Sequence, residues 1–308
     1  MSDEKQAIAS ERRALKKVLD AIPRRKVDEN VLVASWNIAQ FSNKKTKRAL
    51  QYIADICERF DIVAIQEVKS DLRGLSRLQK LLPGDYQILV SDPTGNHERM
   101  AFLYDKRTVL STGLVCEIGF HGSIKAPNTF QFNRSPYCAS FRAGRFDFTI
   151  VSVHIVEGSS HGVVGKKLRK QEIDELVSFI KNRASQNKGK VFDPDFFVLG
   201  DFNIQKYGDQ FFKALTGGEQ PRFKMPRGMN TLGTNFDQSK TYDKIAWLPS
   251  NEFEFTGKFG AIPFGIVLYR EEGQSGDAAR KNVSDHLPLW AEFRVTELES
   301  ELDQIINN

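Results

Sequence analysis

Short hydrophobic runs recur along the chain and predict β-strands. Each run is rich in β-branched and aromatic residues, and charged residues, Gly, Pro or Asn flank it, as is typical of strands bounded by turns. The predicted strands are residues 31–36, 61–66, 86–91, 100–105, 146–155, 196–202, 244–248 and 287–293.

Three segments carry their apolar residues at a helical period. Residues 44–60 and 166–183 are predicted to be amphipathic helices that bury one face each. Residues 4–20 have the same period and end before Pro23, and we expect this helix to lie outside the main core. The predicted core positions of the two internal helices are Leu50, Ile53, Ala54 and Cys57, and Leu168, Ile173, Leu176, Val177 and Ile180.

Strands and helices alternate from end to end, and no linker or repeat separates them. This arrangement predicts one α/β domain over residues 30–296, preceded by a helical extension (1–29) and followed by a tail (297–308). The 308 residues, 40% of them hydrophobic, suffice for a large core and argue against disorder or a coiled coil. Pairs of Phe at alternate positions, such as Phe146 and Phe148, favour aromatic packing between sheets.

Charge and cysteine content add little to this picture. The formal net charge of +5 is compatible with a polyanionic partner without requiring one. No apolar run is long enough for a membrane span, and the first 30 residues lack an export signal. The three cysteines form no metal or redox spacing, so we expect buried thiols in a reducing compartment, the cytoplasm. We expect no membrane partner and no obligate protein partner.

Polar side chains stand where several predicted strands end or begin. Oxygen ligands together with two imidazoles and no cysteine suit a hard cation such as Mg²⁺ or Mn²⁺ better than zinc. A hydrolytic site with a divalent metal follows from this composition. The residues at these strand ends are Asn37, Glu67, His154, Asp201, Asn203, Asp243, Asp285 and His286.

These residues belong to six short motifs whose order resembles that of the endonuclease/exonuclease/phosphatase superfamily, in particular its deoxyribonuclease I branch. The resemblance covers about residues 31–295 and implies a four-layered α/β sandwich with two packed mixed β-sheets, here with an added N-terminal helix. It also implies metal-dependent hydrolysis of a phosphodiester by water. The motifs are SWNI (35–38), QE (66–67), SVH (152–154), GDFN (200–203), YD (242–243) and SDH (284–286).

The resemblance assigns the metal and the attacking water to particular side chains. Glu67 is similar to the family's principal metal ligand, Asn37 to its partner and Asp285 to a further ligand. Asp201 and Asn203 resemble the pair that holds the water and the phosphate. Mg²⁺ is the expected cofactor, with Mn²⁺ or Ca²⁺ as alternatives.

Two imidazoles are assigned to proton transfer by the same resemblance. His286, polarised by Asp243, resembles the general base or phosphate contact, and Asp243 is expected to fix its tautomer. His154 paired with Glu98 is expected to form the acid side that protonates the leaving oxygen. His154 stands where the abasic-site endonucleases have Asn, which argues against that branch.

Several basic residues are candidates for phosphate binding. Arg134, in NRSPY, resembles an arginine that contacts the substrate phosphate in the nuclease branch. Lys69 stands where that branch has an arginine that enters the minor groove, but lysine lacks the planar fork. The basic runs 41–48 and 166–170 follow strand ends that carry site residues, so we expect them on the substrate side. Thr231, Thr234 and Asn235 are further candidates for phosphate contacts.

The favoured interpretation is therefore a deoxyribonuclease I-like endonuclease whose nucleic acid substrate is DNA. Two alternatives stay open. The first is a phosphatase or phosphodiesterase of the same superfamily that acts on a small molecule or a lipid headgroup, since sphingomyelinases also have a histidine at the position of His154. The second is a binding protein on a decayed nuclease fold, which the full set of site residues disfavours.

Overall fold

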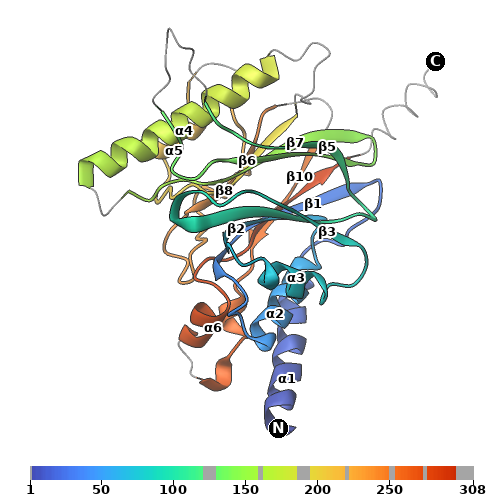
Figure 1. Ribbon diagram of the computed structural model, residues 1–308. Helices are drawn as coiled ribbons and strands as arrows, with labels where there is room; N and C mark the ends of the chain where they lie inside the picture. Colours follow the sequence, from blue (N-terminus) through green and yellow to red (C-terminus); the bar gives the residue numbers. More distant parts are fainter. Residues whose placement is uncertain are drawn as a thin grey trace, which may run out of the picture.

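Two mixed β-sheets form the centre of the computed structural model (Figure 1). The structure describes residues 2–120, 130–158, 162–185, 195–218, 222–249, 254–272 and 276–295. One sheet has six strands in the order β10-β11-β1-β2-β4-β3, and the other has five in the order β5-β6-β7-β8-β9. The strands are β1 (Asn30–Phe41), β2 (Ile62–Lys69), β3 (Tyr86–Val90), β4 (Glu98–Asp105), β5 (Leu110–Glu117), β6 (Tyr137–Ala143), β7 (Phe146–His154), β8 (Phe196–Asp201), β9 (Asp243–Trp247), β10 (Glu254–Ala261) and β11 (Leu289–Arg294).

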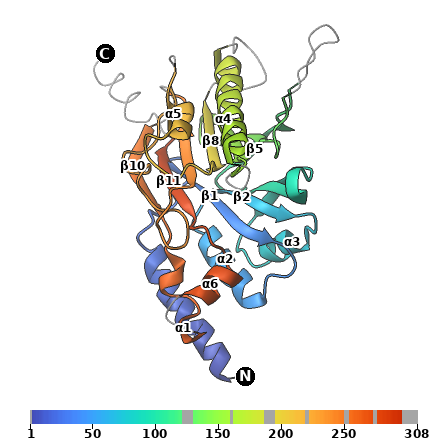
Figure 2. The ribbon, with the colours of Figure 1, turned by 90° about the vertical axis from the view of Figure 1, so that its left-hand side faces the viewer.

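Helices cover the outer face of each sheet. In Figure 2, α4 and α5 lie beyond the five-stranded sheet, whereas α1, α2 and α6 lie on the opposite side of the molecule. The layers are therefore helix, sheet, sheet and helix, as the sequence predicts. The helical elements are α1 (Ser2–Leu19), α2 (Lys47–Cys57), α3 (Arg73–Gln79), α4 (Gly162–Ser185), α5 (Gln210–Thr216) and α6 (Asp277–Asn282), with 3₁₀ turns at Gly95–His97, Phe264–Ile266 and Arg270–Glu272.

Three apolar clusters hold these layers together. The first joins α1, α2, α3 and α6 to the six-stranded sheet, and the third joins α4 and α5 to the five-stranded sheet. The middle cluster fills the space between the sheets, where Phe102 and Phe293 of one sheet meet Phe141 and Phe197 of the other. Phe197 and Phe293 pack edge to face with ring centroids 4.8 Å apart, a geometry that aromatic pairs favour.

The strand register brings the polar strand ends together. β1 is parallel to β2, and β7 is parallel to β8, so the carboxyl ends of each pair lie at one edge. His154 and Asp243 are the direct cross-strand partners of Asp201 on either side of β8. Backbone pairing alone therefore places three of the predicted site residues side by side.

Most of the predicted elements are confirmed. Each of the eight predicted strands overlaps an observed strand, and the ends of α2 and α4 lie within four residues of the predicted helix ends. β5 and β10 were not predicted, because both are edge strands with exposed side chains at many positions. β6 was also not predicted, since its sequence YCASFRA mixes small, polar and apolar residues.

Two packing predictions are wrong. The first helix is part of the main core, because Leu15 and Leu19 are buried against α2 in the first apolar cluster. On α4, Leu168 is half-buried, whereas its neighbour Arg169 is buried and only 3% exposed. The predicted boundary at residue 296 and the tail 297–308 lie outside the described residues. In the part of the chain that is described, no helix combines the length and apolar character needed to cross a bilayer.

Candidate active site

Asp201, the last residue of β8, lies at the centre of the predicted site. Its Oδ2 accepts a 3.2 Å hydrogen bond from Asn37 Nδ2. The same oxygen lies 3.7 Å from Nε2 of His154 and 3.7 Å from Nε2 of His286. Burial raises the pKa of Asp201, but the charges of the two imidazoles outweigh it and leave the pKa below its ordinary value. At neutral pH the centre of the site is therefore an ionised carboxylate flanked by two imidazoles.

Backbone irregularities aim two of the site residues. Near Glu67, β2 shifts register against both of its neighbours, β1 and β4, and Glu67 itself has a φ of 60°. Asn203, two residues after β8, has a φ of 53°. Positive φ is costly for a residue other than glycine and persists where surrounding contacts enforce it. For Asn203 these contacts are its own N–H, which donates to Asp201 Oδ1 (2.9 Å), and its amide, which donates to Ile155 O (2.9 Å).

Asn37 and Glu67 offer oxygen atoms to a cation. Asn37 Nδ2 donates to Glu67 Oε1 (3.1 Å) as well as to Asp201, so its Oδ1 takes no part in either contact. This Oδ1 is buried and has no hydrogen-bond partner among the described residues. A buried acceptor without a donor is destabilising, and a bound cation would satisfy it. These residues thus fit a hard divalent ion, and Asp285, half-buried on the segment before β11, stays a predicted further ligand.

A second group of potential ligands is close by. Carboxylate oxygens of Asp201 and Asp243 and a ring nitrogen of His286 lie within 4.8 Å of one another. Within this group, His286 Nδ1 already forms a 2.9 Å hydrogen bond with Asp243 Oδ2. Asp201 and His286 Nε2 therefore remain available to an ion or a substrate.

The His286–Asp243 pair joins a half-buried imidazole to a fully buried carboxylate. Burial lowers the pKa of His286, but the carboxylates of Asp243 and Asp201 outweigh it and raise the pKa to about 10. Burial raises the pKa of Asp243 above its ordinary value. Thr234 Oγ1 accepts from the N–H of Asp243 (3.0 Å), and its carbonyl accepts from Leu287 N (2.6 Å), so this loop fixes both partners. Thr234 therefore helps to hold the His286–Asp243 pair and is not free to contact a phosphate.

Glu98 lies among three basic groups. Its Oε2 is 3.3 Å from His154 Nδ1 and accepts from Arg134 Nε (2.8 Å), and its Oε1 accepts from Lys69 Nζ (3.1 Å). Burial raises the pKa of Glu98, but its contacts with His154, Arg134 and Lys69 together lower it to about 2. The predicted Glu98–His154 pair is thus brought together. Both predicted phosphate-binding cations are held beside it, at the edge of the site.

Helix α4 supports the site through two buried charged residues that the sequence pattern did not reveal. Glu172, 1% exposed, accepts from the N–H groups of Asn133 (2.6 Å) and Val156 (2.8 Å). Arg169 donates from Nη1 to the carbonyl of Asn203 (2.8 Å) and lies 4.6 Å from the centroid of the Phe211 ring. The helical period predicts an apolar core face and gives no signal for side chains that act on loop backbone.

The predicted basic runs are only partly available to a substrate. In 166–170, Lys166 and Lys167 are exposed, whereas Arg169 is buried and Lys170 pairs with Asp174. In 41–48, Lys45 is buried and donates to Val283 O (2.7 Å), and Arg48 pairs with Glu11 and Glu272. Burial lowers the pKa of Lys45 to about 8, although Asp285 and Glu67 oppose the shift.

Ser284 is a further residue whose role the sequence did not indicate. Its hydroxyl donates to Asn37 O (2.6 Å) and accepts from the N–H of His286 (3.0 Å). It thereby joins β1, the strand that carries Asn37, to the segment that carries Asp285 and His286. Its place in the motif SDH was visible in the sequence, but only the structure shows which strand it binds.

The two-sheet sandwich, with carboxylates and imidazoles gathered at one edge, defines a class of metal-assisted phosphoester hydrolases. The model of the endonuclease/exonuclease/phosphatase family matches residues 34–286, and the chain belongs to that family. It is similar to deoxyribonuclease-1 from Equus caballus, with 25% identity over 279 residues that cover 83% of this chain and 90% of the relative. The match to deoxyribonuclease-1 from Homo sapiens is 29% identical over 185 residues, 56% of this chain, and spans only 60% of that relative.

Solved structures with the same fold come from proteins of different kinds. TDP2 from Caenorhabditis elegans superposes with a TM-score of 0.57 at 18% identity, over 86% of this chain and 74% of that one. A mannosyl-6-phosphatase from Bacteroides thetaiotaomicron has a TM-score of 0.55 at 18% identity, over 85% of this chain and 99% of that one. At this identity the likeness concerns the fold alone.

Proposed function

We propose that this protein is a divalent-metal-dependent endonuclease that cleaves DNA phosphodiester bonds by attack of water. The observation that carries the proposal is the approach of both imidazoles to one oxygen of Asp201 (3.7 Å each). An ionised carboxylate at that point can orient a water molecule, and an imidazole on either side can move a proton. The similarity to the deoxyribonuclease-1 relatives supports DNA as the substrate.

Each side of the site has a distinct part in this proposal. His154, held by Glu98, would donate a proton to the leaving oxygen. His286 would act as the base or as a contact to the phosphate, and its raised pKa supports the second role, because the imidazolium donates from Nε2. Asp201 and Asn203 would hold the water and the phosphate. A divalent cation at Glu67 and Asn37, for which we propose Mg²⁺, would offset negative charge that develops on the phosphate.

A small-molecule phosphoester is the second candidate substrate. The observation in its favour is that Lys69 and Arg134, the two cations predicted to grip a DNA backbone, are both bound to Glu98. A long polyanion contacts many cations, whereas a small phosphoester needs few. The shared fold of the mannosyl-6-phosphatase adds support to this candidate.

A substrate panel separates the candidates. The purified protein is incubated with plasmid DNA, single-stranded DNA, RNA, sphingomyelin and sugar phosphates, each with Mg²⁺, Mn²⁺, Ca²⁺ or EDTA. We expect nicking of the plasmid with Mg²⁺, none with EDTA, and a steep decline as salt rises. Release of phosphate from sugar phosphates, with intact plasmid, would replace the endonuclease proposal by the phosphatase. The cytoplasm stays our prediction for the compartment, to be tested by imaging a tagged copy.

A further inference from the structure

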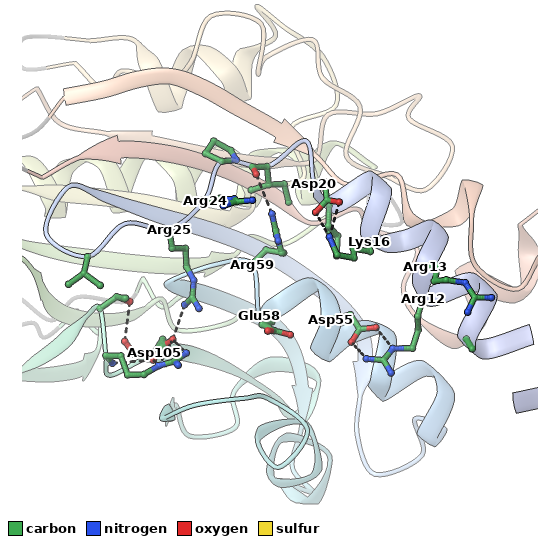
Figure 3. Close-up of a pocket in the computed structure, with 17 residues that line it drawn as sticks. Arg12, Arg13, Lys16, Asp20, Arg24, Arg25, Asp55, Glu58, Arg59 and Asp105 are labelled. Atoms are coloured by element: carbon green, nitrogen blue, oxygen red, sulfur yellow. Dashed lines mark hydrogen bonds and ion pairs between the residues drawn. The ribbon is translucent and has the colours of Figure 1, made fainter. Parts of the chain in front are cut away.

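A large cleft lies away from the candidate active site, beside the first helix (Figure 3). Its volume is about 1250 Å³. Four segments line it: α1, the connector from Ile22 to Val27, the end of α2 near Arg59, and the turn after β4 at Arg107. α1 is anchored there by its buried Leu15 and Leu19, so its polar face is held against the cleft.

The cleft lies at the opposite end of the six-stranded sheet from the candidate active site. Its residues precede β1 and β2 and follow β4, which runs antiparallel to β2. Glu67, in contrast, lies near the carboxyl end of β2, six residues after Asp61, a separation of roughly 20 Å along an extended strand. A ligand in the cleft would therefore leave the catalytic groups free.

Positive charge dominates the cleft. Seven basic and four acidic side chains line it, so the acids cannot neutralise all of the cations. Arg12 pairs with Asp55, Lys16 pairs with Asp20, and both Arg25 and Arg107 pair with Asp105.

Three arginines in the cleft have no carboxylate partner within ion-pair distance among the residues that the structure describes. Arg13 and Arg24 are exposed and form no ion pair or side-chain hydrogen bond with the described residues. Arg59 donates from Nη2 to Ile22 O (3.3 Å), but its Nε is buried and has no partner there (Figure 3). A guanidinium whose donors are unused matches the paired oxygens of a phosphate. The unpaired arginines come from α1, the connector and the turn after α2, so they reach the cleft from three separate segments.

We infer that this cleft is a second, non-catalytic site that binds the phosphate backbone of a nucleic acid. The choice of a nucleic acid rests on the proposed function; the excess of guanidinium groups rests on the structure alone. Binding a second stretch of the same polyanion keeps the enzyme near its substrate after each cut, because the next encounter becomes intramolecular. The site needs no base recognition, so it is independent of sequence.

The test removes the two exposed, unpaired arginines with the double variant Arg13→Ala/Arg24→Ala. Binding of a fluorescent duplex of about 30 base pairs is measured by anisotropy in EDTA, between about 50 and 200 mM salt. We expect binding about tenfold weaker than that of the wild type. The slope of log K against log salt concentration should also become shallower, by the amount that about two phosphate contacts contribute. The matched control is Lys5→Ala/Lys17→Ala, which removes two exposed charges of α1 that do not line the cleft.

Equal loss in both double variants, or unchanged binding in Arg13→Ala/Arg24→Ala, overturns the inference. So does binding of polyglutamate that depends on Arg13 and Arg24 while duplex binding does not, since that points to an acidic protein partner. Hydrolysis of bis(p-nitrophenyl) phosphate with Mg²⁺ should be equal in all variants. Plasmid cleavage by the wild type tests the proposed function separately, because it can succeed or fail whatever the cleft variants bind.

Discussion

At the scale of single residues, the two imidazoles approach one carboxylate oxygen from different sheets. His154 ends β7, and His286 lies on the segment that leads into β11. Each imidazole has a carboxylate at its Nδ1 side: Glu98 lies beside His154, and Asp243 lies beside His286. This leaves both Nε2 atoms for Asp201 and the substrate.

We expect His154→Ala and His286→Ala each to lower kcat on the preferred phosphodiester by about 10²–10⁴-fold, because each removes a proton-transfer group or phosphate contact. Urea unfolding at neutral pH provides the control that both variants fold. The double variant should lose less than the product of the two effects, since residues that act as a unit are not additive. Near wild-type rates in both single variants would refute the assigned roles.

Glu98 should make the free energy of unfolding decrease as the pH falls into the acid range. Its pKa falls from 4.5 to about 2 on folding, so its contribution is complete above about pH 4.5 and is lost as the pH falls toward 2. Between pH 6 and pH 3 this loss amounts to about 2 kcal/mol. We expect Glu98→Gln, measured by urea unfolding at a series of pH values, to lose less stability than the wild type over that range. Parallel curves for the two proteins would contradict this assignment.

At the scale of elements, helix α4 acts as a support that fixes site loops through backbone contacts. Glu172→Gln leaves one acceptor oxygen for two partly buried N–H groups, those of Asn133 and Val156. We expect a loss of about 1–3 kcal/mol in the free energy of unfolding and a several-fold lower kcat/KM, because the segment that carries Arg134 loosens. Glu175→Gln, half-buried on the same helix, is the matched control and should change stability by no more than about 0.5 kcal/mol. An unchanged Glu172→Gln would show that α4 is not needed for this positioning.

Strand β8 depends on a glycine immediately before Asp201. Gly200 has a φ of 137°, and a Cβ there would lie 2.1 Å from the carbonyl oxygen of Val153 on β7. Gly200→Ala must therefore push β7 and β8 apart where His154 pairs with Asp201. We expect loss of activity and a lower thermal midpoint, recorded by calorimetry. Gly113→Ala, on the edge strand β5, is the matched control. Its Cβ meets no atom within 4 Å, so it tests the effect of a positive φ without the clash.

The sequence predicted the elements that are buried on both sides and missed those at edges. Central strands such as β8 are continuously apolar, whereas β5 and β10 expose many side chains and lose that signal. The short polar motifs located the ends of β7 and β8 and the start of β9 correctly. Asn37 and Glu67, in contrast, lie inside β1 and β2, which continue beyond the predicted ends. Arg169 and Glu172 could not be predicted, since their partners are backbone groups brought close only by the tertiary fold.

At the scale of the whole molecule, the candidate site is assembled from both sheets. Asn37 and Glu67 belong to the six-stranded sheet, whereas His154, Asp201 and Asp243 belong to the five-stranded one. Direct links join the halves at the site, among them the hydrogen bonds Asn37–Asp201 and His286–Asp243. Their relative position is set mainly by the aromatic cluster between the sheets.

Because that cluster sets how the two sheets lie against each other, the catalytic rate should report any shift between them. Phe197→Leu removes an aromatic contact with Phe293 at the interface, at a position four residues before Asp201 on β8. We expect it to lower the free energy of unfolding by about 1–2 kcal/mol and to lower kcat disproportionately, with KM little changed. In urea, activity should disappear before the far-ultraviolet circular dichroism does, because a shift of about 1 Å between the sheets misaligns the reacting groups while both remain folded. Coincident loss of the two signals would mean that the sheets separate only on global unfolding.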